Sequence, residues 1–180
     1  MDYTENKIRT INGYSGVIVK VDVDIIELPD GKRALREVVD HPGGVAVMVL
    51  DENNCAVCVR QYRYCFGEHL LEIPAGKLEY GEDSHACAVR ELAEETGISA
   101  GKIVSLGEIY PSPGFCREVL YLYLATELSY GHACLDDGEF LDVIRVPFEE
   151  LLRDVMSGKI KDGKTVAAVL KTKLYMEGSV

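Results

Sequence analysis

The chain has 180 residues, 47% of them hydrophobic, and no low-complexity tract, which is enough material for one well-packed globular domain and a short accessory arm. Its formal net charge of -11 produces a field that repels nucleic-acid backbones, because proteins bind those backbones mainly by neutralising phosphates with Lys and Arg. We therefore expect no nucleic-acid partner. An acidic protein still acts on phosphate compounds when divalent cations lie between its carboxylates and the phosphate oxygens.

Membrane insertion and secretion have no support in the sequence. No segment approaches the roughly 20 apolar residues that span a bilayer, and the first 13 residues lack the apolar core of a signal peptide. We expect a cytoplasmic protein with no membrane partner.

Among six cysteines, Cys55 and Cys58 form a CxxC pair, but no second pair lies at zinc-ligand spacing, and residues three apart in a strand point to opposite faces. Structural thiols are the expectation.

In chain order, residues 13–28 and 34–39 flank a Pro-Asp-Gly turn and predict an N-terminal antiparallel hairpin. A His-Pro-Gly-Gly sequence at 41–44 interrupts the pattern, so we expect an N-terminal β arm over 1–42 and a central domain over 43–180. Further predicted strands are 45–50, 56–64, 102–110, 118–126 and 141–146, and predicted helices are 84–96, 148–157 and 164–176. Strands and helices that do not alternate strictly predict an α/β (α+β) fold in which a mixed sheet lies between helices.

The most informative segment is GKLEYGEDSHACAVRELAEETGI, residues 76–98. Asp83 or Ser84 suits a helix N-cap and Gly97 a left-handed C-terminal residue, which brackets the helix predicted over 84–96. At about 100° per residue, its side chains sort into two groups. The expected apolar face consists of Ala86, Val89, Leu92, Ala93 and Thr96. The expected acidic face consists of Glu91, Glu94 and Glu95.

Glutamates at neighbouring helical positions repel each other by about a few tenths of a kcal/mol per pair, so something should compensate them. Arg90 lies one turn before Glu94 and offsets part of the repulsion, but Glu82 near the helix start adds to the surplus of negative charge. Oxygen ligands of this kind suit Mg²⁺ or Mn²⁺, which bind substrate phosphates at the same time. An ordinary solvated acidic helix face has the same spacing, so spacing alone leaves both interpretations open.

The same segment resembles the Nudix box, Gly-x5-Glu-x7-Arg-Glu-U-x-Glu-Glu-x-Gly-U, where U is aliphatic. Every fixed position is matched, by Gly76, Glu82, Arg90, Glu91, Leu92, Glu94, Glu95, Gly97 and Ile98. Nine constrained positions in one frame are far more specific than a lone glycine motif. The chain is therefore identified as a member of the Nudix hydrolase family.

This resemblance implies a Nudix fold, with the mixed sheet between helices and the box forming a loop, a helix and a loop. It implies that the three glutamates of the acidic face hold a catalytic divalent cation, Mg²⁺ or Mn²⁺. Glu82 would assist them, Arg90 would orient them, and the carbonyl of Ala75 would be a further metal ligand.

Outside the box, the chain resembles the ADP-ribose pyrophosphatase branch of the family over nearly its whole length. The segments that carry this resemblance are 28–31, 36–37, 41–43, 60–64, 71–76 and 110–115. Pro113, sixteen positions after Gly97, matches the proline that marks the branch. Arg117 departs from the branch, in which a small or acidic residue is expected, and either adds a phosphate contact or pairs with Glu118.

From this resemblance, the candidate substrate-binding residues are Arg36, Arg60, Arg63, Glu72, Pro113, Gly114 and Phe115. Arg60 and Arg63 are three apart in a predicted strand, so only one is expected to present its guanidinium to the substrate, and the sequence leaves open which one. Glu72 either touches substrate or makes a structural hydrogen bond. A surface arginine pair and an ordinary surface turn at 111–115 are the alternatives.

The reaction that the resemblance implies is attack of water on one phosphorus of a nucleoside diphosphate sugar, giving AMP and ribose 5-phosphate from ADP-ribose. A general base from a loop distant from the box is expected, and the acidic segment 134–140 has that character. Glu139 is the predicted base, with Asp136 and Asp137 as substitutes. A box glutamate such as Glu94, or an acidic loop without a catalytic role, is the alternative.

The N-terminal arm resembles the one through which this branch forms domain-swapped homodimers, so the resemblance implies a homodimer. Periodicity alone shows only a hairpin that needs a surface to cover it. Three other functions stay open or are set aside. One is Nudix hydrolysis of another nucleoside diphosphate sugar or nucleotide, and a second is a module that binds ADP-ribose without cleaving it, although such modules usually lose box glutamates. The third, a structural acidic protein that binds Ca²⁺, is set aside because this sequence lacks the ligand spacing of an EF-hand.

Overall fold

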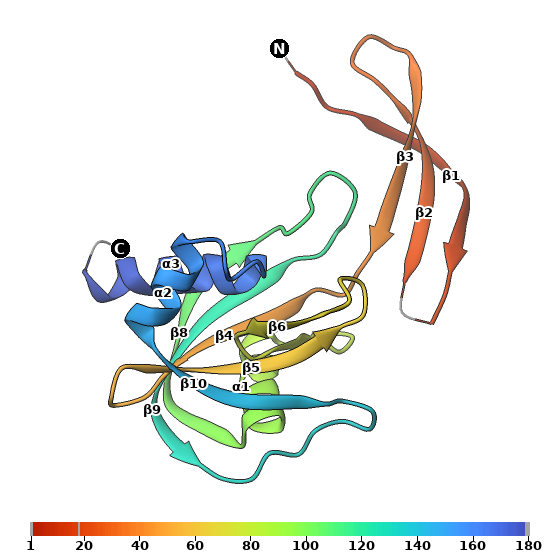
Figure 1. Cartoon of the computed structure of the whole chain (residues 1–180). Coiled ribbons are helices and arrows are strands. Elements are labelled where there is room, and N and C mark those ends of the chain that lie inside the picture. The colour runs from red at the N-terminus through yellow and green to blue at the C-terminus, as the bar shows by residue number, and fades with distance from the viewer. Residues whose placement is uncertain (1, 18, 179–180) are drawn as a thin grey trace. The chain divides into compact units, whose positions relative to one another are not determined.

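The computed structural model describes residues 2–17 and 19–178, which divide into two compact units. The first unit comprises residues 1–43 and 110–119, and the second comprises residues 44–109 and 120–180. Figure 1 follows the chain through both. Within the described residues, no helix is long and apolar enough to cross a membrane.

The first unit contains a three-stranded antiparallel sheet in the order β1 (Asn6–Ser15), β2 (Lys20–Glu27) and β3 (Arg33–Asp40). The predicted hairpin was therefore wrong in one respect, because residues 13–28 are not a single strand. The N–H of Gly16 donates to the carbonyl of Val19 at 2.9 Å and closes a turn between β1 and β2. Ile18, within the predicted strand, lies outside the described residues.

Residues 110–119 join this unit by backbone hydrogen bonds to β3. The N–H of Val39 donates to the carbonyl of Phe115 at 2.7 Å, and the N–H of Arg117 donates to the carbonyl of Val39 at 3.0 Å. Nothing in the local sequence signals this pairing, because it joins segments more than 70 residues apart.

The second unit is built on a seven-stranded mixed sheet in the order β10-β5-β4-β9-β8, with β6 paired to β5 and β7 paired to β4. The pairing of β4 with β9 is parallel, and the other pairings are antiparallel. The strands are β4 (Gly44–Leu50), β5 (Cys55–Arg63), β6 (Glu68–Glu72), β7 (Ala75–Lys77), β8 (Ile98–Ile109), β9 (Leu120–Tyr130) and β10 (Leu141–Pro147). The helices are α1 (Ser84–Thr96), α2 (Phe148–Met156) and α3 (Gly163–Met176). The prediction of a mixed sheet between helices is confirmed.

Helices cover both faces of this sheet, with α1 on one face and α2 and α3 on the other (Figure 1). All seven residues of β4 are buried for this reason. Alternate residues enter different clusters: Val45 and Val47 pack with α1, whereas Ala46 and Met48 pack with α2 and α3. A continuous apolar run is the pattern that a strand covered on both faces requires.

Candidate active site

Helix α1 has the predicted bounds, and both of its ends are capped. The carboxylate of Asp83 accepts hydrogen bonds from the N–H groups of His85 and Ala86, at 3.1 and 3.0 Å. At the other end, Gly97 has a left-handed φ of 69°, and its N–H donates to the carbonyl of Ala93 at 2.9 Å. These two caps hold the box carboxylates on a helix of defined length.

The predicted apolar face of α1 was correct for Leu92 and wrong for Ala86, Val89 and Ala93. Its buried residues are Cys87, Ala88, Leu92 and Glu95, whereas Ala86, Val89 and Ala93 are exposed. The angular grouping of the side chains is as expected, but the helix is rotated so that part of its acidic face turns toward the protein. A helical wheel orders side chains around an axis, and only tertiary packing decides which side is covered.

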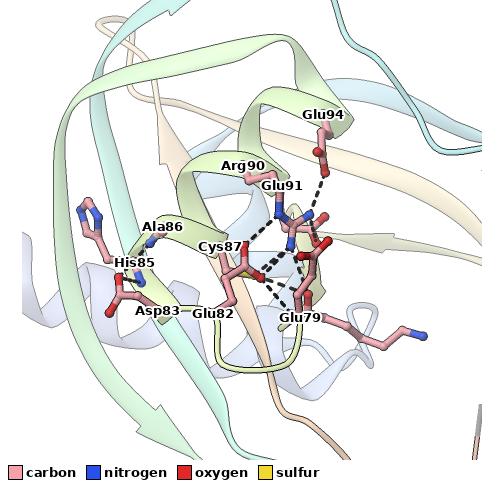
Figure 2. A network of polar contacts seen from close by, with 10 residues as sticks. Glu79, Glu82, Asp83, His85, Ala86, Cys87, Arg90, Glu91 and Glu94 are labelled. Atoms are coloured by element: carbon pink, nitrogen blue, oxygen red, sulfur yellow. Dashed lines mark hydrogen bonds and ion pairs between the residues drawn. The ribbon is translucent and has the colours of Figure 1, made fainter.

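Arg90 is the centre of the charge network on α1 (Figure 2). Its Nε and Nη2 donate to the two carboxylate oxygens of Glu82 at 2.9 and 3.0 Å, and its Nη1 donates to Glu91 and Glu94 at 2.8 Å each. Its Nη2 also reaches the carbonyl of Lys77 at 3.2 Å. One guanidinium thus holds three carboxylates, which is the geometry that an orienting residue needs.

Hydrogen bonds of this network hold the carboxylate of Glu82 in place. The carboxylate accepts from Arg90 and from the N–H of Glu79, the latter at 2.9 Å. Mainly because of Arg90, the pKa of Glu82 falls to about 2. Glu82 is therefore a permanent anion with its oxygens already engaged, and it anchors Arg90 from the loop before the helix.

Glu91 lies against the backbone of Gly76 in β7. A Cβ placed on Gly76 would stand only 1.8 to 2.1 Å from the carboxyl atoms of Glu91, which explains why this position requires glycine. Burial raises the pKa of Glu91, and the negative charges of Glu94 and Glu139 raise it further, against the opposing effect of Arg90.

Glu95 is the most buried of the box carboxylates, with 4% of the residue exposed. Its Oε2 accepts from the N–H of Ala75 at 3.0 Å. Burial raises the pKa of Glu95 to about 8, and Glu139 and Glu91 add to the shift, whereas the Ala75 hydrogen bond and Lys164 oppose it. Among the described residues, Arg90 makes its hydrogen bonds to Glu82, Glu91 and Glu94 and none to Glu95, so burial and the neighbouring carboxylates dominate the pKa of Glu95.

The acidic loop before β10 lies beside the end of α1. The N–H of Gly131 donates to the carbonyl of Gly97 at 2.7 Å, and the N–H of Cys134 donates to the carbonyl of Glu94 at 2.9 Å. Glu139 is half-buried, and its charge acts on both Glu91 and Glu95, whereas Asp136 and Asp137 are exposed. Of the three acids predicted in this loop, Glu139 is half-buried and raises the pKa of both Glu91 and Glu95.

The two candidate arginines of β5 lie on opposite faces of the sheet, as their spacing predicts. Successive side chains of a strand point to opposite faces of the sheet. Arg63 therefore lies on the same face as Val57, which packs with α1, and Arg60 lies on the same face as Cys58, which packs with α2 and α3. Arg60 pairs with Asp142 at 2.8 Å. Arg63 is therefore the arginine on the same face as the box helix.

Arg63 is fixed by Glu72, at the end of β6. Its Nε and Nη2 donate to the two oxygens of Glu72 at 2.7 and 2.6 Å, a bidentate pair. Glu72 is only 1% exposed and accepts a further hydrogen bond from Lys164 of α3. Burial alone would raise the pKa of Glu72, but Arg63 and Lys164 hold it below its ordinary value. The structural role considered for Glu72 is thus present.

Sequence reasoning missed the contribution of α3 to this region. Asp162 caps α3 by accepting from the N–H of Thr165 at 3.1 Å and also accepts from Lys164 at 2.9 Å. The hydroxyl of Thr165 in turn accepts from the N–H of Ile73 at 3.0 Å. The Asp-x-x-Thr spacing was available in the sequence as a cap signal, but its connection to residue 73 depends on the tertiary fold.

The remaining candidate residues lie in the first unit. Arg36 is engaged by Glu5, with its Nε donating at 3.0 Å. Pro113, Gly114 and Phe115 form part of the 110–119 segment attached to β3.

Arg117 belongs to the same segment, and its Nη1 lies 3.8 Å from Asp40. Glu118 instead lies 3.8 Å from His41, so the anticipated Arg117–Glu118 pair is not the one observed among the described residues.

The carboxylates fit a divalent cation by donor chemistry. In the described part of the chain, no three His, Cys, Asp or Glu side chains already stand in metal-ligand geometry, and Arg90 engages three of the candidate carboxylates. Glu91 and Glu95 nevertheless supply oxygen donors whose proton affinity is raised by burial and by mutual repulsion. A bound cation relieves both effects, so the donor set suits Mg²⁺ or a similar hard ion.

Comparisons with known proteins give a family and a fold for this chain. A model of the NUDIX domain matches residues 40–169. A solved structure, the crystal structure of an ADP compounds hydrolase, has a TM-score of 0.85 over 97% of this chain and 95% of its own, at 20% sequence identity. At that identity, the likeness shows the fold.

Two curated relatives are similar over most of their length. A methanol dehydrogenase activator from Bacillus methanolicus is 44% identical over 93% of this chain and 91% of its own. An ADP-ribose pyrophosphatase from Bacillus subtilis is 41% identical over 87% of this chain and 85% of its own. The match to the domain model spans more than half of the chain, and it contains the arginine-centred carboxylate helix described above; the chain belongs to the Nudix family.

Proposed function

We propose that this protein is a metal-dependent hydrolase that cleaves the diphosphate of ADP-ribose to AMP and ribose 5-phosphate. The observation that carries the proposal is the group of carboxylates Glu91, Glu95 and Glu139, in which burial and mutual repulsion raise the pKa of the first two. Members of the family generally need a divalent cation. The relative named ADP-ribose pyrophosphatase, at 41% identity, supports the choice of substrate.

In this proposal, Glu91 and Glu95 hold the cation, with Glu94 and the carbonyl of Ala75 as further ligands. The N–H of Ala75 already donates to Glu95, which brings this backbone turn next to the carboxylates. Glu82 assists by anchoring Arg90, which then orients Glu91 and Glu94. A bound divalent cation supplies charge neutralisation at the phosphate oxygens and a lower pKa for a bound water.

Arg63 is the proposed contact to the diphosphate. Of its five N–H donors, two are used by Glu72, and the side chain is 40% exposed. Arg90, in contrast, has its donors engaged by Glu82, Glu91, Glu94 and the carbonyl of Lys77. Arg63 is held by a bidentate pair and its other N–H donors have no partner among the described residues, which suits binding of a phosphate in one orientation.

The chemical step is attack of a water oxygen on one phosphorus of the diphosphate. A new P–O bond forms, the bond from that phosphorus to the bridging oxygen breaks, and the bridging oxygen leaves on the other phosphate. In this proposal Glu139 accepts the proton of the water; what supports it is that its charge acts on Glu91 and Glu95 and that its loop is hydrogen-bonded to the end of α1.

Three finer features belong to the same proposal. Mg²⁺ is the proposed ion, with Mn²⁺ as the substitute, because both accept oxygen ligands together with substrate phosphates. We also propose a homodimer formed through the N-terminal arm and a cytoplasmic location. The predicted substrate contacts of Arg36, Pro113, Gly114 and Phe115 stay predictions.

A panel of substrates tests the proposed function. It contains ADP-ribose, GDP-mannose, other nucleoside diphosphate sugars, NADH and diadenosine polyphosphates, each assayed with Mg²⁺ and with chelator. The expected result is that kcat/KM is highest for ADP-ribose and that the products are AMP and ribose 5-phosphate. Preferred cleavage of another member would contradict the substrate and leave the hydrolysis in place. Binding of ADP-ribose without cleavage of any member would favour the binding-module alternative.

A further inference from the structure

Lys164 is a partly buried charged residue close to Glu72, and the proposed mechanism gives it no role. It is the second residue of α3, and 12% of its side chain is exposed. Its ammonium donates to Glu72 and, at 2.9 Å, to Asp162. Removing a lysine charge from water is unfavourable unless the charge is paired, and here two carboxylates pair with it.

Glu72 joins Lys164 to Arg63. Glu72 is almost fully buried, and it pairs with two cations from elements far apart in the sequence. Arg63 is the last residue of β5, and Lys164 is the second residue of α3. With Lys164 in place, the Oε2 atom of Glu72 accepts from both cations. The carboxylate plane is thereby fixed, and a bidentate partner has to follow that plane.

Lys164 is itself held by a rigid frame. Asp162, which caps α3, accepts from Lys164 and from the N–H of Thr165. The hydroxyl of Thr165 accepts from the N–H of Ile73, the residue after Glu72. The start of α3 therefore fixes Glu72 through its side chain and through the following backbone. Two residues further on, Ala75 contacts Glu95.

We propose that Lys164 is a positioning residue for the hydrolytic reaction, which fixes Glu72 so that the N–H donors of Arg63 that Glu72 does not use face the substrate diphosphate beside the carboxylates of α1. The inference rests on the proposed function. It assigns no contact between Lys164 and the substrate. The electrostatic influence of Lys164 on Glu95 and of Glu95 on Arg63 is consistent with this arrangement.

The expected consequence of losing Lys164 is a misoriented Arg63 in a protein that still folds. A displacement of about 1 Å in a positioning group costs on the order of 10²-fold in rate, and loss of a supporting partner typically costs about 10 to 100-fold. We expect the decrease to fall mainly on kcat, since the Arg63 contact would still form in the bound substrate but with the wrong geometry for the reaction.

The test compares three variants with the parent protein. Lys164→Met removes the charge and keeps the length of the chain, Lys164→Arg keeps the charge, and Lys171→Met is the matched control. Lys171 lies on the same helix, is also partly buried, and donates to the backbone carbonyl of Leu106 instead of a carboxylate. Steady-state hydrolysis of ADP-ribose and thermal unfolding are measured for each.

We expect Lys164→Met to lower kcat by about tenfold or more with a smaller change in KM, Lys164→Arg to restore most of the rate, and Lys171→Met to retain it. A purely structural role predicts the opposite, a lower unfolding temperature with unchanged kcat and KM in the protein that remains folded. That outcome overturns the inference. A parent protein that leaves ADP-ribose intact overturns the proposed function instead.

A second measurement does not depend on activity. The exchange rate of the Arg63 Nε proton is followed by NMR, with the resonance assigned by its disappearance in Arg63→Lys. In the parent protein this proton donates to Glu72 and is expected to exchange slowly. Faster exchange in Lys164→Met and parent-like exchange in Lys171→Met support the inference, whereas equal exchange in all three shows that Lys164 does not fix the guanidinium.

Discussion

At the residue scale, the environment gives the glutamates of one motif different properties. Glu82 accepts from Arg90 and from a backbone N–H, and its pKa falls to about 2. Glu95 is buried close to other carboxylates and shares none of the Arg90 hydrogen bonds found among the described residues, and its pKa rises to about 8. The motif specifies the residue type at both positions, but burial and the reach of Arg90 decide which carboxylate is anchored and which needs a cation.

Glu139→Gln tests the assignment of the general base. Because the amide keeps the shape and loses the ability to accept a proton, turnover of ADP-ribose should fall by about 10² to 10⁴-fold with a much smaller change in KM. Asp137→Asn, an exposed acid of the same loop, is the matched control and should keep the parent rate. Rates that are equal for Glu139→Gln and the parent would remove Glu139 from this role.

The cysteines provide a test of burial through their pKa values. Burial raises the pKa of the Cys58 thiol to about 12, so at pH 8 only about one molecule in 10⁴ carries the reactive thiolate. Cys65 and Cys134 are exposed. A thiol reagent at pH 8 should label these two in the folded protein and reach Cys58 only after unfolding in urea, as mass spectrometry of the labelled peptides will show. Rapid labelling of Cys58 in the folded protein would contradict its place in the core.

At the scale of elements, strong local signals predicted α1 well. Its N-cap and left-handed glycine fixed both ends, because cap geometry depends on neighbouring residues only. The strands β6 and β7 were missed, since they have only five and three residues and exist because longer strands pair with them. The covered side of α1 was missed for the same reason, as it depends on strands and loops distant in the sequence.

Gly97→Ala tests the C-terminal end of α1. An alanine there would have a left-handed φ, which costs about 1 to 2 kcal/mol, and its Cβ would lie 2.7 Å from backbone atoms of residues 132 and 133. We expect a larger loss in the free energy of unfolding, measured in urea, than for the control Gly158→Ala. Gly158 has a similar φ of 76° with open space around the site of a Cβ.

The comparison of the two glycine variants isolates the packing of the loop against the helix. Equal losses for Gly97→Ala and Gly158→Ala would mean that the 131–134 backbone does not pack against the end of α1. The position of Glu139 would then lose one of its supports, because the same loop carries it.

At the scale of the whole molecule, the mixed sheet between helices followed from the order and spacing of apolar segments. The uninterrupted apolar run of β4 indicated a strand covered on both faces, and it lies at the centre of the sheet. The first unit was predicted less completely, because β1 and the attachment of residues 110–119 to β3 depend on pairings that leave no local pattern. Arg63 and Glu139 were named from resemblance, whereas their grouping with Lys164 and Glu95 required the tertiary structure.

The proposed homodimer gives a prediction at the same scale. Light scattering coupled to gel filtration should give roughly twice the chain mass of 19.9 kDa. A variant that lacks residues 1–42 is expected to elute as a monomer, since these residues form the proposed dimerisation arm. A monomeric full-length chain at micromolar concentration would contradict the dimer and would leave the hydrolytic site as described.

The central claim is that the carboxylates of α1 support metal-dependent attack of water on the diphosphate of ADP-ribose. The most direct measurement is hydrolysis in ¹⁸O-labelled water, with Mg²⁺ or with chelator, for the parent protein, Glu95→Gln and the exposed control Glu150→Gln. We predict that the parent and the control produce AMP and ribose 5-phosphate, that one of the two products carries a single label, and that chelator or Glu95→Gln abolishes turnover in a protein that is still folded. Unlabelled products, turnover that persists in chelator, or an unchanged rate in Glu95→Gln would contradict the account.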